Sequence, residues 1–475
     1  MPKQLALILF TSFVLWLFVR DRKLRPMPSR ASWIALLWIM IIGSRPISLW
    51  FDNNVQMDIS DPYHLEGSAF DRNVYIFLIV AGLMILFTRR LNWSRIFASN
   101  RWLFMFFVFC GISVIWADLP FVSMKRWIKD VGHLVMVLII LTEKDPVQAL
   151  RSVFMRYTYF ALPMSILFIK YYPDIGRYYN RWTWEVSYAG VTLEKNTLGP
   201  VAVICGMFIV WEMIYARKVA GGKYDALDLL GRIVLLIMAI WLLGIAHSAT
   251  AIICFVLGIG ILVYMQLPSA RRKMQHLGRL SIVLAFLLII FYSSSGITEA
   301  IVQLVGRNMT LTGRTDIWEE VLREPINRFI GTGYQSFWFG VRAERMWEKY
   351  YFRPNQAHNG YLETYLNGGL VGLSLLMAMI VTASGKLKRD VLAGKNDGIL
   401  LFALFVVVLF SNWTEATFNK MSLLWIILII TALLPPLTAM QKLKNTGSDT
   451  INDGAASVPR ARFRTPVLSR KRIYF

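Results

Sequence analysis

The chain has 475 residues, of which 56% are hydrophobic and only 17% are charged, and its mean hydropathy is +0.50. A soluble domain carries about 25% charged residues, so these values exclude an ordinary water-soluble protein. The formal net charge is +22. Because the Lys and Arg residues are spread over many loops instead of gathering on one face, this charge does not indicate a nucleic-acid-binding protein.

The apolar residues form about a dozen runs of roughly 17 to 22 residues, each long enough to cross a membrane as a helix. The sequence therefore predicts an all-α, polytopic integral membrane protein with about 12–13 transmembrane helices. The first run is interpreted as a span and not as a signal peptide, because no small-residue cleavage site follows it. We expect spans near 4–20, 31–50, 73–88, 102–119, 121–142, 152–170, 197–215, 231–246, 249–266, 279–296, 358–381, 399–413 and 421–440.

Cofactor motifs are absent from the sequence. Cys110, Cys205 and Cys254 lie inside apolar runs without paired spacing, so neither a disulfide framework nor a metal site is expected. The sequence has no Asp-x-Asp for a metal-held nucleotide sugar and no Gly-x-x-x-x-Gly-Lys loop. We therefore expect no metal and no cofactor, and chemistry that does not depend on a nucleotide.

Alternate connections between the expected spans are rich in Lys and Arg, which is typical of cytoplasmic loops. This pattern predicts a transmembrane helical domain over 1–440 and a disordered, basic cytoplasmic tail over 441–475 that can contact anionic headgroups. The longest connection, 297–357, lies on the outer side. It is rich in aromatic residues and too apolar to be disordered, so we expect a structured loop with helices near Asp316–Arg323 and Phe337–Tyr350.

Several basic residues of the outer side do not follow the rule that positive charge stays inside. They lie near Arg126, near Lys195 and throughout the loop 297–357. Basic residues on this side suggest an anionic ligand there.

Arg314 lies in the segment Gly313-Arg-Thr-Asp-Ile-Trp318 of this loop, and Arg307 lies about two helical turns earlier. A guanidinium is always charged and presents a planar fork of donors, so at a membrane surface it suits a phosphate or diphosphate. The structural alternative is a solvated ion pair between Arg314 and one of the acids that follow it.

His358 opens the segment His358-Asn359-Gly-Tyr-Leu-Glu363 at the outer end of a span. Positions 358, 362, 365, 369 and 372 would share one face of a helix. An imidazole titrates near neutrality and can take a proton from a sugar hydroxyl as a general base. The alternative is an interfacial histidine that is hydrogen-bonded to the backbone of a neighbour.

Further polar residues cluster at the outer ends of spans, where ionisable groups are costly unless they are paired or functional. Lys195, before one span, either binds phosphate or anchors at the interface, and the same two alternatives hold for Arg126. Glu415, after another span, either orients a base or caps a helix. His133, within an apolar run, is more typical of a hydrogen-bonded core residue.

Taken together, these segments resemble the O-antigen ligase and polymerase family of bacterial membrane glycosyltransferases, most closely its exopolysaccharide polymerase branch. The resemblance covers about residues 100 to 435 and rests on six segments in order. One departure is Ala249, where some members carry Arg, and it weakens a phosphate role for that hairpin. The segments are Ser113–Asp118 with Lys125-Arg126, Glu194–Gly199, Ser248–Thr250, Gly313–Trp318 with Gly331–Gly333, His358–Glu363 with Gly369–Gly372, and Asn412–Glu415.

The resemblance implies a fold like that of GT-C glycosyltransferases and a multi-pass protein of the bacterial inner membrane with its site facing the periplasm. It implies a donor glycan on undecaprenyl diphosphate, transferred with inversion and without metal. Arg314 would hold the diphosphate and His358 would activate the acceptor hydroxyl. Lys195, Arg126, Arg307, Asn359 and Glu415 are the further residues expected to bind or support substrate.

The expected activity is polymerisation of lipid-linked repeat units into exopolysaccharide. A ligase that moves a finished glycan once, to a lipid core or a protein, remains the nearest alternative, since it would use the same donor. A transporter of an anion or a lipid-linked glycan is a third. It predicts charged residues near mid-membrane on several spans, whereas only Arg156 and Glu212 lie well inside spans. The expected partners are donor, acceptor glycan, membrane lipids and polysaccharide export proteins, and no nucleic acid.

Overall fold

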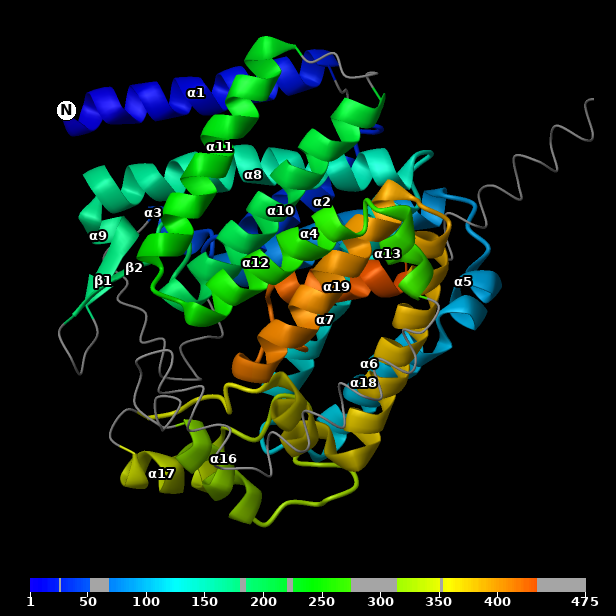
Figure 1. The fold of residues 1–475 in the computed structure, drawn as a ribbon. Helices are drawn as coiled ribbons and strands as arrows, with labels where there is room; N and C mark the ends of the chain where they lie inside the picture. The colour runs from blue at the N-terminus through cyan, green and yellow to red at the C-terminus, as the bar shows by residue number, and fades with distance from the viewer. Residues whose placement is uncertain are drawn as a thin grey trace, which may run out of the picture.

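The computed structural model describes residues 1–24, 27–51, 68–179, 185–219, 225–274, 314–350 and 353–433. The regular secondary structure of the described chain is almost entirely helical, which confirms the all-α prediction (Figure 1). A short antiparallel hairpin, β1 (Arg177–Tyr179) with β2 (Val186–Tyr188), is the exception, and its register pairs Arg177 with Tyr188. The predicted tail 441–475 and the predicted span 279–296 lie outside the described residues.

Seven described helices are long and apolar enough to cross a membrane. They are α1 (Lys3–Leu24), α4 (Ala69–Thr88), α8 (Pro146–Tyr171), α10 (Lys195–Val219), α11 (Ala226–Ile245), α18 (Gly360–Leu392) and α19 (Asn396–Thr414). An eighth span is possible if α5 (Trp93–Ser99) counts together with α6 (Arg101–Ile112) and η2 (Ser113–Trp116), across a bend of 92°.

Shorter apolar helices occupy three of the remaining expected spans. These are α2 (Ser32–Ile42), α12 (Ala249–Tyr264) and the helix Leu423–Leu433, and α7 (Pro120–Leu141) fills the span expected at 121–142. The chain is therefore a multi-pass membrane protein, and the count of 12–13 spans stays a prediction. The remaining elements are the short α3 (Ser48–Phe51), α9 (Pro173–Gly176) and α13 (Pro268–Lys273), and α16 (Arg314–Arg323) and α17 (Gly340–Lys349) of the long loop.

Local sequence explains where several of these helices begin. Ser68 and Asp71 form a capping box at α4, and Asp145 caps α8 immediately before a proline at its first position. Ser248 caps α12 through the amide of Ala251. The Ser-x-Thr segment singled out in the sequence thus has a structural role at its first residue.

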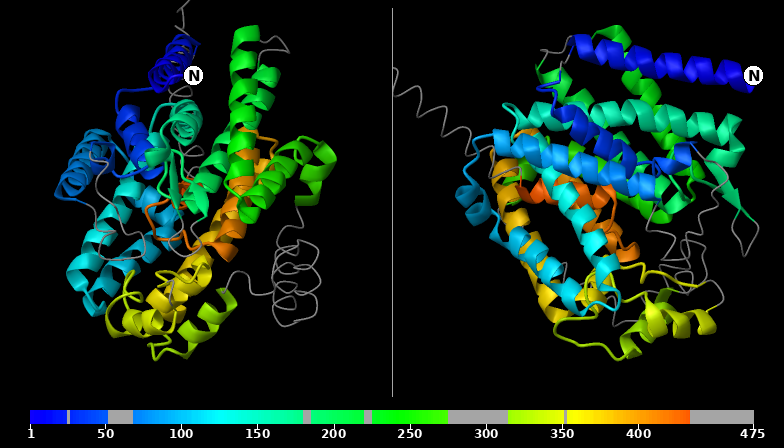
Figure 2. Two further views of the ribbon diagram at one scale, coloured as in Figure 1. Left: turned by 90° about the vertical axis from the view of Figure 1, so that its left-hand side faces the viewer. Right: turned by 180° about the vertical axis from the view of Figure 1, so that it is seen from behind.

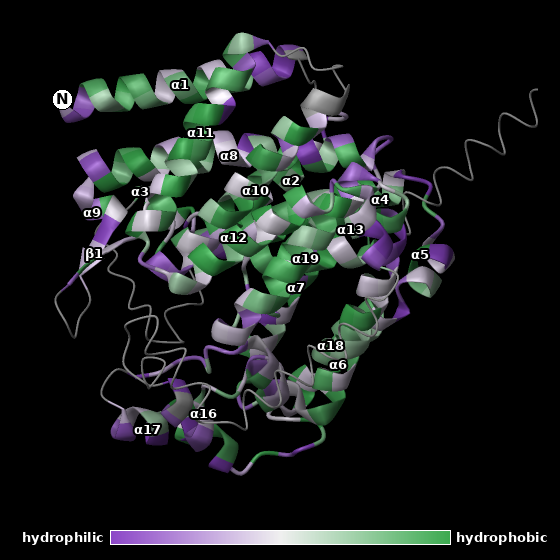
Figure 3. Cartoon of the chain, viewed as in Figure 1, coloured by the Kyte–Doolittle hydropathy of each residue, from purple (hydrophilic) through white to green (hydrophobic). Residues whose placement is uncertain are grey.

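The core lies along α8, the second half of α7, α10, α19 and the helix Leu423–Leu433, whose side chains are mostly buried. Helices α1, α4 and α11 instead expose apolar side chains such as Ile8, Phe77 and Ile237. Figure 2 shows α1 and α11 at one edge of the molecule, and Figure 3 shows that the spans are apolar while α16 and α17 are hydrophilic. Exposed apolar side chains on long helices are what a bilayer would cover.

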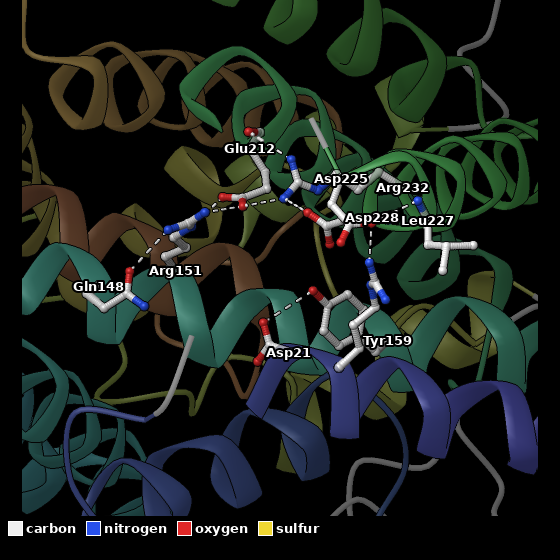
Figure 4. A network of polar contacts seen from close by, with 10 residues as sticks. Asp21, Gln148, Arg151, Tyr159, Glu212, Asp225, Leu227, Asp228 and Arg232 are labelled. Carbon is white, nitrogen blue, oxygen red and sulfur yellow. Dashed lines mark hydrogen bonds and ion pairs between the residues drawn. The ribbon is translucent and has the colours of Figure 1, made fainter. Parts of the chain in front are cut away.

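Several charged residues inside the spans are paired with one another, and Figure 4 shows Glu212 between Arg151 and Arg232. Arg156 of α8 donates to Asp21 of α1 at 2.7 Å, and the two side chains are only 1% and 2% exposed. Glu212 of α10 accepts from Arg151 of α8 and from Arg232 of α11. These pairs tie four helices together at the end of the bundle opposite α16 and α17.

Helix α18 is broken at Gly369, which has φ +61° and ψ −161°. The segment 328–333 of the long loop fills the break. The amides of Leu370 and Val371 donate to the carbonyls of residues 328 and 329, and the amides of Thr332 and Gly333 donate back to residues 366 and 367. A Cβ at position 369 would come within 2.3 Å of the Phe329 backbone, so only glycine fits.

This break corrects one prediction. The shared face of positions 358, 362, 365, 369 and 372 does not exist, because α18 begins at Gly360 and changes direction at Gly369. His358 lies before the helix, with a left-handed backbone at φ +48°. Helical periodicity alone cannot detect a break that depends on the backbone of a distant loop.

Candidate active site

Glu415 lies at the C-terminal end of α19 and contacts two residues that are far from it in sequence. Its Oε1 accepts a hydrogen bond from Nη2 of Arg314 at 3.1 Å. Its Oε2 lies 3.5 Å from Nδ1 of His358. Arg314 also donates through Nη1 to the carbonyl of Thr414. The two residues predicted to be catalytic are therefore joined by one carboxylate.

The three side chains are largely enclosed but still accessible. Glu415 is 13% exposed, Arg314 18% and His358 25%. The contact to Glu415 uses Nδ1 of His358, so the opposite ring nitrogen, Nε2, is the one that can face a further group. A carboxylate behind a half-buried imidazole suits a base that must become charged during a reaction.

Charges around this trio set the protonation of two carboxyl groups. Burial by itself would raise the pKa of Glu415, but the hydrogen bond and charge of His358 and the charge of Arg314 hold it below its usual range. Glu194, just before α10, behaves oppositely: burial and the charge of Glu415 raise its pKa. The site thus pairs one ionised carboxylate with a second that binds a proton more readily.

Lys420 is a further charged residue at the site that the sequence analysis did not single out. Its Nζ donates to Oε1 of Gln356 at 3.0 Å. Burial lowers the pKa of Lys420, and the opposing charges of Glu363, Glu415 and Glu194 offset this effect only in part. The signal was present in the sequence, because Lys420 is the lone basic residue in the short connection between the last two apolar runs.

Polar segments from three further elements meet beside Glu415. A small cleft is lined by residues at the starts of α10 and α12, by residues near the end of α19 and by Leu424. Thr250, which lines this cleft, shares a hydrogen bond of 2.8 Å with Thr414. The cleft brings together Asn196, Ser248, Thr250 and Glu415, which belong to three of the six segments recognised in the sequence.

Two comparisons with known proteins indicate what this chain is similar to. A family described as O-antigen ligase matches residues 233–377, a range that includes Arg314 and His358. An exopolysaccharide production protein, ExoQ of Rhizobium meliloti (strain 1021), is 29% identical over 331 residues, which cover 67% of this chain and 73% of ExoQ. Over residues 233–377 the chain is thus similar to the O-antigen ligase family. Both similarities support a role of the membrane glycan ligase or polymerase type.

The other residues predicted to bind substrate differ in how far they are buried and in what they contact. Asn359 is buried, and its Oδ1 caps α18 by accepting from the amides of Tyr361 and Leu362. Arg126 donates to the carbonyl of Gln335 at 3.2 Å and lies over the ring of Phe339. Its charge also acts on Lys420, which places it near the cluster.

Lys195 is the first residue of α10, and its backbone amide donates to the hydroxyl of Tyr178 at 3.3 Å. Its side chain is half-buried next to Glu194. Arg307 lies outside the described residues. Binding of substrate by these residues stays a prediction.

His133 is the hydrogen-bonded core residue that the sequence predicts, since its Nδ1 accepts from the indole of Trp38 at 2.9 Å. Within the described ranges no group of three or more His, Cys, Asp or Glu side chains is arranged to hold a metal ion.

Proposed function

We propose that this protein joins oligosaccharide repeat units carried on undecaprenyl diphosphate into exopolysaccharide, at the periplasmic face of the bacterial inner membrane. The observation that carries this proposal is the bridge from Glu415 to both Arg314 and His358. One carboxylate thereby contacts both His358, the base in this proposal, and Arg314, its diphosphate-binding cation.

The proposed reaction is an inverting displacement. Nε2 of His358 removes the proton of an acceptor hydroxyl as its oxygen attacks the anomeric carbon of the donor sugar. The bond from that carbon to the diphosphate oxygen breaks, and its electron pair leaves on the diphosphate. Glu415 stabilises the imidazolium that forms, in the way that a buried carboxylate supports a catalytic histidine elsewhere.

Arg314 supplies charge for the leaving group. Two of its five N–H donors are used by Thr414 and Glu415, which fixes the guanidinium and leaves donors for a phosphate oxygen. A lipid diphosphate is already a good leaving group, and a guanidinium that stabilises its growing charge gives a metal-independent route.

A ligase is the second candidate. The match to a family described as O-antigen ligase favours it, whereas the relative named for exopolysaccharide production favours polymerisation. Both would use the same donor and the same three residues, so the acceptor distinguishes them.

The test uses purified protein in lipid, with an undecaprenyl-diphosphate-linked repeat unit as the sole substrate. Polymerisation predicts a ladder of products that His358→Ala and Arg314→Ala do not make. Arg323→Ala is the matched control, because Arg323 ends the same helix that Arg314 begins and pairs only on the surface with Glu319. A product that forms only after a lipid-core acceptor is added would replace the polymerase proposal with the ligase.

A further inference from the structure

Ala357, the residue before His358, is held at both of its backbone polar groups. It is fully buried. Its carbonyl accepts a hydrogen bond of 2.6 Å from the indole Nε1 of Trp318. Its amide donates to Oε2 of Glu363 at 2.9 Å. Two side chains from different helices therefore fix the peptide groups on either side of this residue.

Glu363 is itself held firmly in the first turn of α18. It is buried, and the indole of Trp338 donates to its Oε1 and Oε2 at 3.0 and 3.1 Å. A buried carboxylate needs such donors, because an unpaired one would be strongly destabilised. All these contacts are with groups of the long loop, so Glu363 ties α18 to that loop.

We call the contacts of Trp318 and Glu363 with the backbone of Ala357 the clamp. His358 lies between this clamp and the cap of α18. The next residue, Asn359, bonds the first amides of the helix. The left-handed backbone of His358, φ +48°, is unfavourable for a residue with a side chain and persists only when its surroundings impose it. The contacts on both sides of His358 impose it here.

Trp318 also connects the clamp to Arg314. The two residues are four positions apart on α16, so their side chains leave the same face of the helix. One end of that face reaches Glu415 and the other reaches Ala357. A single helix thus sets the distance between the guanidinium and the histidine backbone.

We propose that Trp318 and Glu363 are positioning residues that hold the imidazole of His358 against Glu415. The proposal rests on the proposed function, in which His358 is the base. Neither residue touches the reacting atoms. Both act through the peptide groups of Ala357, and loss of either bond lets the histidine backbone relax away from its left-handed conformation.

The chain offers a matched pair of substitutions for the test. Trp318→Phe removes one indole bond to a backbone carbonyl and keeps an aromatic ring in the same small core. Trp347→Phe does the same in the same loop, since Trp347 donates to the carbonyl of Pro354 at 3.0 Å. Pro354 is four residues from His358, so only the first substitution reaches the clamp.

We expect Trp318→Phe to lower kcat by roughly tenfold or more with little change in KM, because misplacement of a catalytic group costs rate and not binding. The kcat of Trp347→Phe should stay within about twofold of the wild-type value, because this variant loses one comparable hydrogen bond that does not reach His358. Glu363→Gln replaces one of the two acceptor oxygens by an NH₂ group, which cannot accept from Trp338 or Ala357, and it should resemble Trp318→Phe. Equal kcat values for the two tryptophan variants would overturn the proposal.

A second measurement needs no substrate. Diethyl pyrocarbonate modifies accessible neutral imidazoles, and mass analysis of the peptide that contains His358 gives the rate of its modification. Trp318→Phe should change this rate severalfold, and Trp347→Phe should not. If the wild type makes no polymer, the proposed function fails, but the modification rates still decide whether the clamp holds His358; unchanged rates in both variants would refute it.

Discussion

Replacement of Glu415 by Gln removes the charge that joins the two halves of the site while keeping the side chain's shape. In the structure this carboxylate lies 3.5 Å from Nδ1 of His358 and 3.1 Å from Arg314. In the proposed mechanism, the substitution leaves the imidazolium that forms during transfer without its counter-charge. We therefore expect the rate of transfer to fall while the amount of protein in the membrane stays normal.

The magnitude follows from the geometry. At 3.5 Å and an effective dielectric constant of about 20, Coulomb's law gives roughly 5 kcal/mol between Glu415 and a protonated His358. Both side chains keep some contact with solvent, so screening reduces this to roughly 2–3 kcal/mol. That difference corresponds to a rate about 30- to 150-fold lower.

The assay is the initial rate of chain extension in proteoliposomes. Glu319→Gln is the control, because Glu319 carries the same charge in an exposed i,i+4 pair with Arg323 on α16. It should extend chains at the wild-type rate. A Glu415→Gln protein that keeps more than half of the wild-type rate would show that His358 does not need this carboxylate, and the proposed mechanism would be wrong.

Three further outcomes follow from the same structure. Gly369→Ala should lower the thermal unfolding midpoint by several degrees, since its Cβ would collide with the backbone of Phe329, whereas Gly385→Ala on the same helix has open space and should not. The pKa of Glu415 is lowered in the folded state, so the ionised carboxylate stabilises the fold above the ordinary Glu value near 4.5, and this stabilisation is lost as pH falls through the lowered pKa. The unfolding midpoints of the wild type and Glu415→Gln should therefore differ at neutral pH and converge in acid. Chelation with excess EDTA should leave the rate of transfer unchanged, and restoration of a lost rate by Mg²⁺ or Mn²⁺ would contradict metal-independent transfer.

Hydropathy predicted most of the helices because each contains a long, mainly apolar run. Helix α8, for example, begins at the capped proline and ends near the predicted boundary. The sequence did not predict α5, since a seven-residue helix leaves no periodic signal, or the β1–β2 hairpin, whose strands are three residues long. The break in α18 depends on contacts with residues 328–333, and no local pattern encodes such contacts.

Residue chemistry identified Arg314, His358 and Glu415 as candidates, and the structure brings these three together. The sequence did not reveal how they are connected, because they lie 44 and 57 residues apart, on segments that meet only in the fold. The sequence predicts no separate role for Glu363, which is the last residue of the segment that begins at His358. Its role at Ala357 depends on a bond to the backbone, which residue type and spacing do not disclose.

The two clusters of charged residues in this membrane protein differ in how far they are buried. Ionisable groups inside a membrane are functional candidates by default, yet Arg156 and Asp21 are fully enclosed and bonded to each other. A ligand could reach them only if the pair broke, and breaking a buried pair costs several kcal/mol, of the order of 3–5. Arg314, His358 and Glu415 remain partly exposed at the opposite end of the bundle, so a substrate can contact them without disrupting the fold. The accessible cluster is therefore the one suited to chemistry, while the enclosed one holds α1 against α8.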